Sequence, residues 1–297
     1  MDNNLTIFCR ITKLFLLFIV IGFGAYSDET NASPKSEIIE INNINDVLEH
    51  ATHGTMVLFD IDNTLLEPIQ TLGSDQWFRW RLQQLKEQGH VHSIALEMAL
   101  QDWTPIVTAT QVKAVESTAP TCIKALQNDN AIIMGITTRA SCLSHATYEQ
   151  LKSINIQLHQ TAPHSTQDVI FLNPLEVIYE NGVLFTNGTN KGDAFFKFLA
   201  LIKQQHPAAV LFINDKRSHL EEIQRACADK GVPFIGLRYG YLDKKVRALQ
   251  EDIAEYQFQT FQTFQHCEHS QYFSRFLPDD EARKAIELRA SHSIPPL

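Results

Sequence analysis

The chain has 297 residues, a formal net charge of −9 and 44% hydrophobic residues. This length suits one large domain or a core with an inserted subdomain, and the apolar content is sufficient for a sizeable core. The acidic balance argues against a general nucleic-acid-binding protein, which needs a basic face. It leaves a small phosphorylated molecule open as a partner, because a local lysine, a metal ion and backbone amides can hold phosphate in an acidic protein.

Residues 1–27 have the pattern of a secretory signal peptide. Arg10 and Lys13 supply the positive charge, residues 14–21 form an unbroken apolar run, and small residues suited to signal-peptidase cleavage follow at 25–27. The apolar run is short for a bilayer span. The pattern therefore predicts export to the periplasm or beyond, with no stable membrane insertion after signal removal. An uncleaved N-terminal membrane anchor stays open as the alternative.

Short apolar runs later in the chain predict the buried strands of a parallel sheet. A run that is apolar at every position is typical of a strand covered on both faces. Helical patterns separate these runs, and this alternation predicts an α/β fold with a Rossmann-like three-layer core. The runs cover residues 56–59, 131–136, 209–213 and 233–237.

Between the first two runs, residues 71–126 have helical periodicity and are predicted to form a helical cap inserted into the core. The core itself is assigned to residues 28–70 and 127–240, and residues 241–297 to a C-terminal helical extension. The pair Asn181-Gly182 stands between two strand-like segments and is typical of a type I′ hairpin turn.

The predicted strand ends carry the residues best suited to chemistry. Ligands of open α/β sheets bind outside the carboxyl ends of the strands. Asp60 and Asp62 follow the first strand, and Thr137 follows the second, where its hydroxyl could hold a phosphate oxygen. Asp215 follows the third strand and offers a hard oxygen ligand for Mg²⁺. Lys191 begins a helix, where its charge and the helix N-terminus both favour an anion.

Each of these residues also has a simpler structural explanation. An aspartate after a strand commonly belongs to a turn, a threonine commonly caps a helix, and most lysines are surface residues. The specific signal is the order in which they recur along the chain, at the ends of separate strands and the start of one helix.

This order resembles the haloacid dehalogenase superfamily in its phosphatase branch, and more narrowly an uncharacterised group of exported bacterial proteins within it. The first motif of that superfamily resembles Asp60-Ile61-Asp62-Asn63-Thr64 after an apolar strand. The second and third resemble Thr137 and Lys191, and the fourth, an acidic pair after a strand, resembles Asn214-Asp215. The resemblance covers the predicted core only.

The resemblance implies a Mg²⁺-dependent phosphatase that works through an aspartyl-phosphate. Asp60 is implied to be the nucleophile, and Asp62 the acid and base. The implied metal ligands are Asp60, the backbone carbonyl of Asp62, and Asp215, while Thr137 and Lys191 are implied to position the phosphate. Asp62 favours phosphoryl transfer, because the dehalogenases of the superfamily have no acid at that place.

Two positions depart from the superfamily pattern. The fourth motif usually begins with aspartate, and this chain has Asn214 there. If Asp215 is the metal ligand, Asn214 can sit beside it as an amide; if Asn214 took that place, metal affinity would fall because one charge is missing. His219 stands where an acid or asparagine is common, so either a contact with metal-bound water or an ordinary surface position is open.

The cap region contains five residues that could choose a substrate. Trp77 and Trp80 are more often core than substrate platform at their helical spacing, and the role of Trp103 is open. Arg79 or Arg81 could contact a second anionic group, although a solvated face is the default for both.

Two other functions remain open beside the phosphatase. A binding or host-directed protein on a degenerate scaffold would keep the fold and lose turnover. A phosphomutase would return the phosphoryl group to its substrate. The joint presence of all five site residues favours the phosphatase over the degenerate scaffold and leaves the phosphomutase open. Neither the substrate nor the oligomeric state follows from the sequence.

Overall fold

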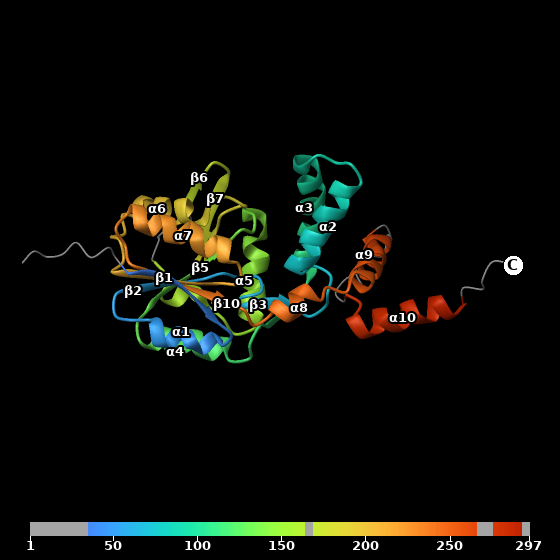
Figure 1. Ribbon diagram of the computed structural model, residues 1–297, viewed down its shortest axis with the longest axis horizontal. Coiled ribbons are helices and arrows are strands. Elements are labelled where there is room, and N and C mark those ends of the chain that lie inside the picture. Colours follow the sequence, from blue (N-terminus) through green and yellow to red (C-terminus); the bar gives the residue numbers. More distant parts are fainter. Residues whose placement is uncertain (1–34, 164–168, 266–275, 293–297) are drawn as a thin grey trace, which may run out of the picture. The chain divides into compact units, whose positions relative to one another are not determined.

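The computed structural model describes residues 35–163, 169–265 and 276–292 (Figure 1). The predicted signal segment, residues 1–27, lies outside these ranges. Among the described residues, no helix combines the length and the apolar character needed to cross a bilayer.

An eight-stranded sheet forms the centre of the protein. Six neighbouring strands, from β1 to β8 in spatial order, run parallel, and the last two pair antiparallel. In spatial order the strands are β1 (Ser36–Ile41), β10 (Phe234–Tyr239), β9 (Ala209–Asn214), β2 (Thr55–Phe59), β5 (Ile132–Thr137), β8 (Val183–Phe185), β7 (Glu176–Glu180) and β6 (Val169–Leu172). The predicted α/β class with a largely parallel sheet is confirmed.

Helices cover both faces of this sheet, which explains why its central strands are mostly apolar. Successive side chains of a strand point to opposite faces. Val57 and Phe59 of β2 therefore join one core cluster, while Met56 and Leu58 join the other. The first cluster lies under α1 (Val47–His50), α4 (Ala119–Asn128) and α5 (Ser144–Ser153), and the second lies under α6 (Lys191–Leu201) and α7 (Arg217–Asp229) (Figure 1).

The inserted helical unit covers fewer residues than the predicted range of 71–126. Two long helices, α2 (Asp75–Glu87) and α3 (His92–Ala109), pack on each other, and the short antiparallel strands β3 (Leu66–Pro68) and β4 (Val112–Ala114) frame them. The remaining helix, α4, packs its apolar stripe against the sheet and belongs to the core. Helical periodicity shows that a helix has an apolar face, but it does not show which partner covers that face.

The C-terminal extension completes the cap. It contains α8 (Asp243–Arg247), α9 (Glu251–Gln265) and α10 (Asp279–His292). Phe258 of α9 lies 5.5 Å from Trp77 of α2 between ring centroids, and both belong to one buried cluster with Leu72, Trp103 and Ala254. We call this set the cap cluster. The insert and the extension, far apart in sequence, thus share one apolar core.

Asp279 links the extension to the base of the cap through hydrogen bonds. Its carboxylate accepts hydrogen bonds of 2.8 Å from the backbone and hydroxyl of Thr71 and from the amide of Gln257. We expect Asp279→Ala to lower the free energy of unfolding by about 1–3 kcal/mol, because three donors lose their acceptor. Asp280→Ala is the control, since its exposed pair with Lys284 should contribute no more than about 0.5 kcal/mol. Urea unfolding measures both, and equal losses would contradict the role of Asp279.

Candidate active site

The site lies at the carboxyl end of β2, where the strand order reverses. From β2 the chain passes to β5 and β8 on one side of the sheet, and it later returns to β9 on the other side. Such a switch point leaves a crevice between diverging connections, and ligands of open α/β sheets bind there. Asp60 and Asp215 lie directly after β2 and β9, as the sequence predicts, whereas Thr137 is the last residue of β5 itself.

A tight loop turns the chain away from the sheet directly after Asp60. The Asp60 amide still donates to Ile213 of β9 at 3.0 Å, so the residue is held at the end of the ladder. Asn63 then adopts a left-handed conformation, with φ of 59°, which asparagine tolerates better than most residues. Its side-chain amide lies 3.5 Å from a carboxylate oxygen of Asp215. The loop thus brings the ends of β2 and β9 together.

Lys191 and Asp60 form a buried ion pair at this site. The Lys191 ammonium donates to Asp60 Oδ1 at 2.6 Å and to the carbonyl of Ile136 at 3.0 Å, and its side chain is fully buried. Burial raises the pKa of Asp60, while the charge of Lys191 acts in the opposite direction. A buried lysine with a carboxylate and a carbonyl as acceptors is positioned to neutralise a further anion beside Asp60.

Gly192 allows the side chain of Lys191 to reach its buried position beside Asp60. A Cβ at position 192 would lie 2.4 Å from the carbonyl oxygen of Glu222 in α7. Only glycine allows α6 to approach α7 this closely, and that approach places the start of α6 over the strand ends.

Asp215 is the carboxylate of the site best suited to a cation. Its Oδ1 is buried and has no hydrogen-bond partner among the described residues. Burial, which is the larger cause, and the nearby charge of Asp60 together raise the pKa of Asp215 to about 7. Two neighbouring carboxylates with an unsatisfied oxygen fit a hard divalent cation such as Mg²⁺, which takes oxygen ligands. Groups of three or more His, Cys, Asp or Glu suited to a metal do not occur in the described ranges, so a third protein ligand would have to be another kind of group, such as a backbone carbonyl or a side-chain amide oxygen.

Asp215 gives a pH dependence that can be measured without activity. In the metal-free protein a raised pKa favours the protonated carboxyl, so its stabilising contribution is present at low pH and is lost as the pH rises through about 7. We expect wild type in EDTA to lose, between about pH 4 and pH 8, on the order of 1 kcal/mol more unfolding free energy than Asp215→Asn. Urea unfolding at both pH values measures this difference. Parallel losses in the two proteins would contradict it.

The Asp62 side chain is held by a residue that the sequence analysis did not single out. Arg139 donates to both carboxylate oxygens of Asp62, at 2.7 and 2.9 Å. Arg139 is only 4% exposed, and its remaining nitrogen donates to Thr147 and Gln150. Its position two residues after Thr137, at the same strand end, is the signal by which it could have been found.

Thr137 orders the loop that carries Arg139. Its hydroxyl accepts a hydrogen bond from the Arg139 amide at 3.2 Å, and its carbonyl accepts two from Thr186. The side chain is buried next to the end of β2. The structure therefore places Thr137 within the strand-end site.

Asn214 and His219 support the loop after β9. The side-chain oxygen of Asn214 accepts a hydrogen bond from the backbone amide of Lys216 at 2.7 Å. The side-chain nitrogen of Asn214 lies 3.4 Å from His219 Nδ1. Burial lowers the pKa of His219 to about 2, with further lowering by Lys191 and Lys216, so its ring is neutral and can accept from Asn214. This arrangement fits the alternative in which Asn214 sits beside Asp215 as an amide.

The tryptophans of the cap have packing roles. Trp77 is fully buried in the cap cluster, and Trp103 is 8% exposed, with its indole N–H donating to the carbonyl of Gly73. Trp80 packs against the same cluster. Arg81 donates to Asp102 at 2.8 Å and lies over an aromatic ring of α9, so it too has a structural role.

Arg79 differs from Arg81 because it faces the strand-end loops. It donates to Asp75 at the start of α2, and the same carboxylate accepts from Lys216 after β9 at 2.8 Å. Burial alone would raise the pKa of Asp75, but the charges of Lys216 and Arg79 outweigh it and hold that pKa below its usual value. This ion-pair network connects the cap to the site.

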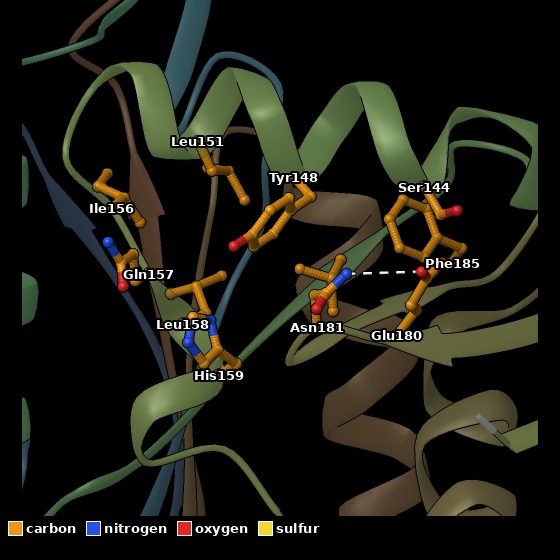
Figure 2. Close-up of a pocket in the computed structure, with 11 residues that line it drawn as sticks. Ser144, Tyr148, Leu151, Ile156, Gln157, Leu158, His159, Glu180, Asn181 and Phe185 are labelled. Carbon is orange, nitrogen blue, oxygen red and sulfur yellow. Dashed lines mark hydrogen bonds between the residues drawn. The ribbon is translucent and has the colours of Figure 1, made fainter. Parts of the chain in front are cut away.

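A second cavity lies beneath α5, and it is not an alternative to the strand-end site. Figure 2 shows Tyr148, His159 and Asn181 around it. Its volume is about 10 Å³, which is room for about one water molecule. None of the predicted site residues lines it.

A family described as "Protein of unknown function (DUF2608)" matches residues 37–274. The chain belongs to this family. The matched range includes the sheet, the cap helices and α9, while α10 lies beyond it.

Several curated relatives are similar over most of the chain. A protein of Chlamydia trachomatis named "Putative outer membrane protein" is 27% identical over 203 residues, covering 68% of this chain and 75% of the relative. A Chlamydia pneumoniae protein with a similar name is 24% identical over 254 residues, covering 82% and 90%. An uncharacterized protein of Rickettsia prowazekii is 26% identical over 263 residues, covering 82% and 92%. These names state no activity.

Proposed function

We propose that this chain is a Mg²⁺-dependent phosphate-monoester hydrolase of the haloacid dehalogenase superfamily, with Asp60 as the nucleophile. One observation carries the proposal: a buried aspartate lies 2.6 Å from a fully buried lysine, beside a second aspartate with an unsatisfied buried oxygen. This set stands at the switch point of a parallel sheet. An anionic nucleophile, a cation for the phosphate and a metal-binding carboxylate are the parts that phosphoryl transfer to an aspartate requires.

In the first step a carboxylate oxygen of Asp60 attacks phosphorus. The bond between phosphorus and the ester oxygen breaks, and the leaving oxygen takes a proton from Asp62. The products of this step are the free alcohol and an acyl phosphate on Asp60. Lys191 and Thr137 hold the phosphoryl oxygens, and Lys191 offsets their charge.

In the second step a water molecule attacks phosphorus of the acyl phosphate. Asp62, now a carboxylate, takes a proton from this water, and the bond between phosphorus and Asp60 breaks. Inorganic phosphate leaves, and both aspartates return to their starting states. Asp60 and Asp215, through their carboxylates, and Asp62, through its backbone carbonyl, would hold Mg²⁺, which would supply positive charge that offsets the repulsion between nucleophile and substrate.

Arg139 is proposed to position Asp62. It engages both carboxylate oxygens, so Asp62 must release one of them before it can handle the proton of the leaving group or of water. We expect Arg139→Lys to slow the pre-steady-state release of the alcohol about 10-fold or more for an alkyl phosphate and less for p-nitrophenyl phosphate, because lysine cannot hold both oxygens in one plane. Exposed Arg225→Lys is the control. Equal slowing of alcohol release from both esters would contradict a role of Arg139 in positioning Asp62 as the acid.

Hydrolysis of p-nitrophenyl phosphate by wild type, with and without Mg²⁺, tests the proposed function. We expect release of inorganic phosphate that depends on the metal. Phosphate transfer within a sugar phosphate, without release, would favour a phosphomutase. Absence of turnover over a panel of small phosphate monoesters would favour a binding protein on the same scaffold.

We also propose that the chain is exported through residues 1–27. The names of the chlamydial relatives, which call them outer membrane proteins, support export in general terms. A mature N-terminus at or near Asp28 is the expected result of N-terminal sequencing. Met1 retained in the membrane fraction would instead support the N-terminal anchor.

A further inference from the structure

A cavity of about 310 Å³ opens beside Asp215. The start of α7, the end of β10, α8 and one residue of the cap helix α2 form its walls. Four cationic side chains line it: Arg79, Lys216, Arg217 and Arg238. Asp215 belongs both to this cavity and to the proposed active site, so the two spaces adjoin.

Among the residues that line the cavity, the four cations outnumber the two carboxylates, Asp215 and Asp243. Arg79 and Lys216 share the single carboxylate of Asp75. Arg238 pairs with Asp243. The fourth cation, Arg217, reaches Glu40 at 2.9 Å, in a pair whose side chains are 52% and 59% exposed. Exposed pairs of this kind contribute little and exchange readily with another anion.

The first turn of α7 adds to this positive field. It contains no acidic residue, and Lys216 and Arg217 stand at its N-cap and first position. A helix N-terminus carries partial positive charge, which favours anions and disfavours cations. Two basic side chains at this place therefore leave positive charge that an incoming anion would offset.

The cavity also has an apolar part to its lining. Tyr239, Leu242 and Val246 contribute to it, and the first two are almost completely buried. Such a lining suits the carbon skeleton of a small molecule, while the guanidinium groups suit a phosphate, which they can bind through two hydrogen bonds at once.

We propose that this cavity binds a second phosphate group of the substrate, so that the preferred substrates are small phosphate monoesters that carry another phosphate. The inference rests on the proposed function, because it assumes that the first phosphate lies beside Asp60. With one phosphate there and Asp215 shared by both spaces, the second phosphate enters among Arg79, Lys216, Arg217 and Arg238.

Binding to the Asp60→Asn protein tests this inference without turnover. Isothermal titration calorimetry in Mg²⁺ compares fructose 1,6-bisphosphate with fructose 6-phosphate. We expect at least about 10-fold tighter binding of the bisphosphate, since one additional charge-assisted contact is worth about a factor of ten. Adding Arg217→Gln should remove most of this preference. Arg225→Gln, an exposed position on the same helix and outside the cavity, should keep it.

Equal affinity for the two sugar phosphates would overturn the cavity proposal. Equal effects of the two arginine variants on the bisphosphate preference would also overturn it. Circular dichroism confirms that each variant is folded. The proposed function is judged separately by turnover of p-nitrophenyl phosphate in wild type. Turnover without a preference for the bisphosphate would support the proposed phosphatase activity and reject the proposed second phosphate site. A preference for the bisphosphate without turnover would support the second phosphate site and reject the phosphatase activity.

Discussion

Asp60→Asn is expected to reduce phosphatase turnover by about 10⁴-fold or more, the scale seen when a covalent nucleophile is removed. The amide has the shape of the carboxylate, and its oxygen can still accept from Lys191, so the fold should persist. The amide cannot attack phosphorus or form an acyl phosphate. Steady-state hydrolysis of p-nitrophenyl phosphate measures the loss, and the unfolding midpoint checks the fold.

Asp229→Asn is the matched control for this variant. It makes the same chemical change at an exposed position near the end of α7, away from the strand ends. Its turnover should equal that of wild type. If Asp60→Asn retained wild-type turnover in a preparation free of contaminating phosphatase, Asp60 would not be the nucleophile.

Asp62→Asn should produce the second-largest effect, and its size should depend on the leaving group. An alkyl alcohol leaves poorly without a proton, so its phosphate should be hydrolysed about 10²- to 10⁴-fold more slowly. p-Nitrophenolate leaves without protonation, so the first step with p-nitrophenyl phosphate should slow much less. Pre-steady-state release of the alcohol from each ester measures this step directly.

The burst of p-nitrophenolate gives a further test of the same residue. Because Asp62 also activates water, its loss should slow the second step, and the acyl phosphate should accumulate after a fast burst. Equal slowing of alcohol release from both esters would contradict the acid role. It would indicate instead that Asp62 matters mainly through its contact with Arg139.

The strand ends were accessible from the sequence because local patterns determine them. Each central strand contains a run of apolar residues, and a polar residue follows that run, so the edge of the sheet could be located without knowing the strand order. Asp60, Thr137 and Asp215 were found in this way, and Lys191 was found at the start of a helix. Their approach in space then follows from the order of β5, β2 and β9 in the sheet.

Contacts between distant segments were not accessible in the same way. The cap cluster joins Trp77 to Phe258, and no periodicity in either helix names its partner. Arg139 pairs with Asp62, 77 positions earlier, and no local pattern around either residue names the other. The cavity beside Asp215 likewise takes its cations from three separate parts of the chain.

The phosphorylated enzyme itself provides the most direct test of Asp60 as nucleophile. Wild type is mixed with excess p-nitrophenyl phosphate and Mg²⁺, quenched in acid within the first turnovers, and digested for mass spectrometry. The account predicts a phosphoryl group on the peptide containing Asp60, with borohydride reduction converting that residue alone to homoserine. A phosphoryl group on another residue, or none during measurable turnover with direct transfer of oxygen from water, would contradict it.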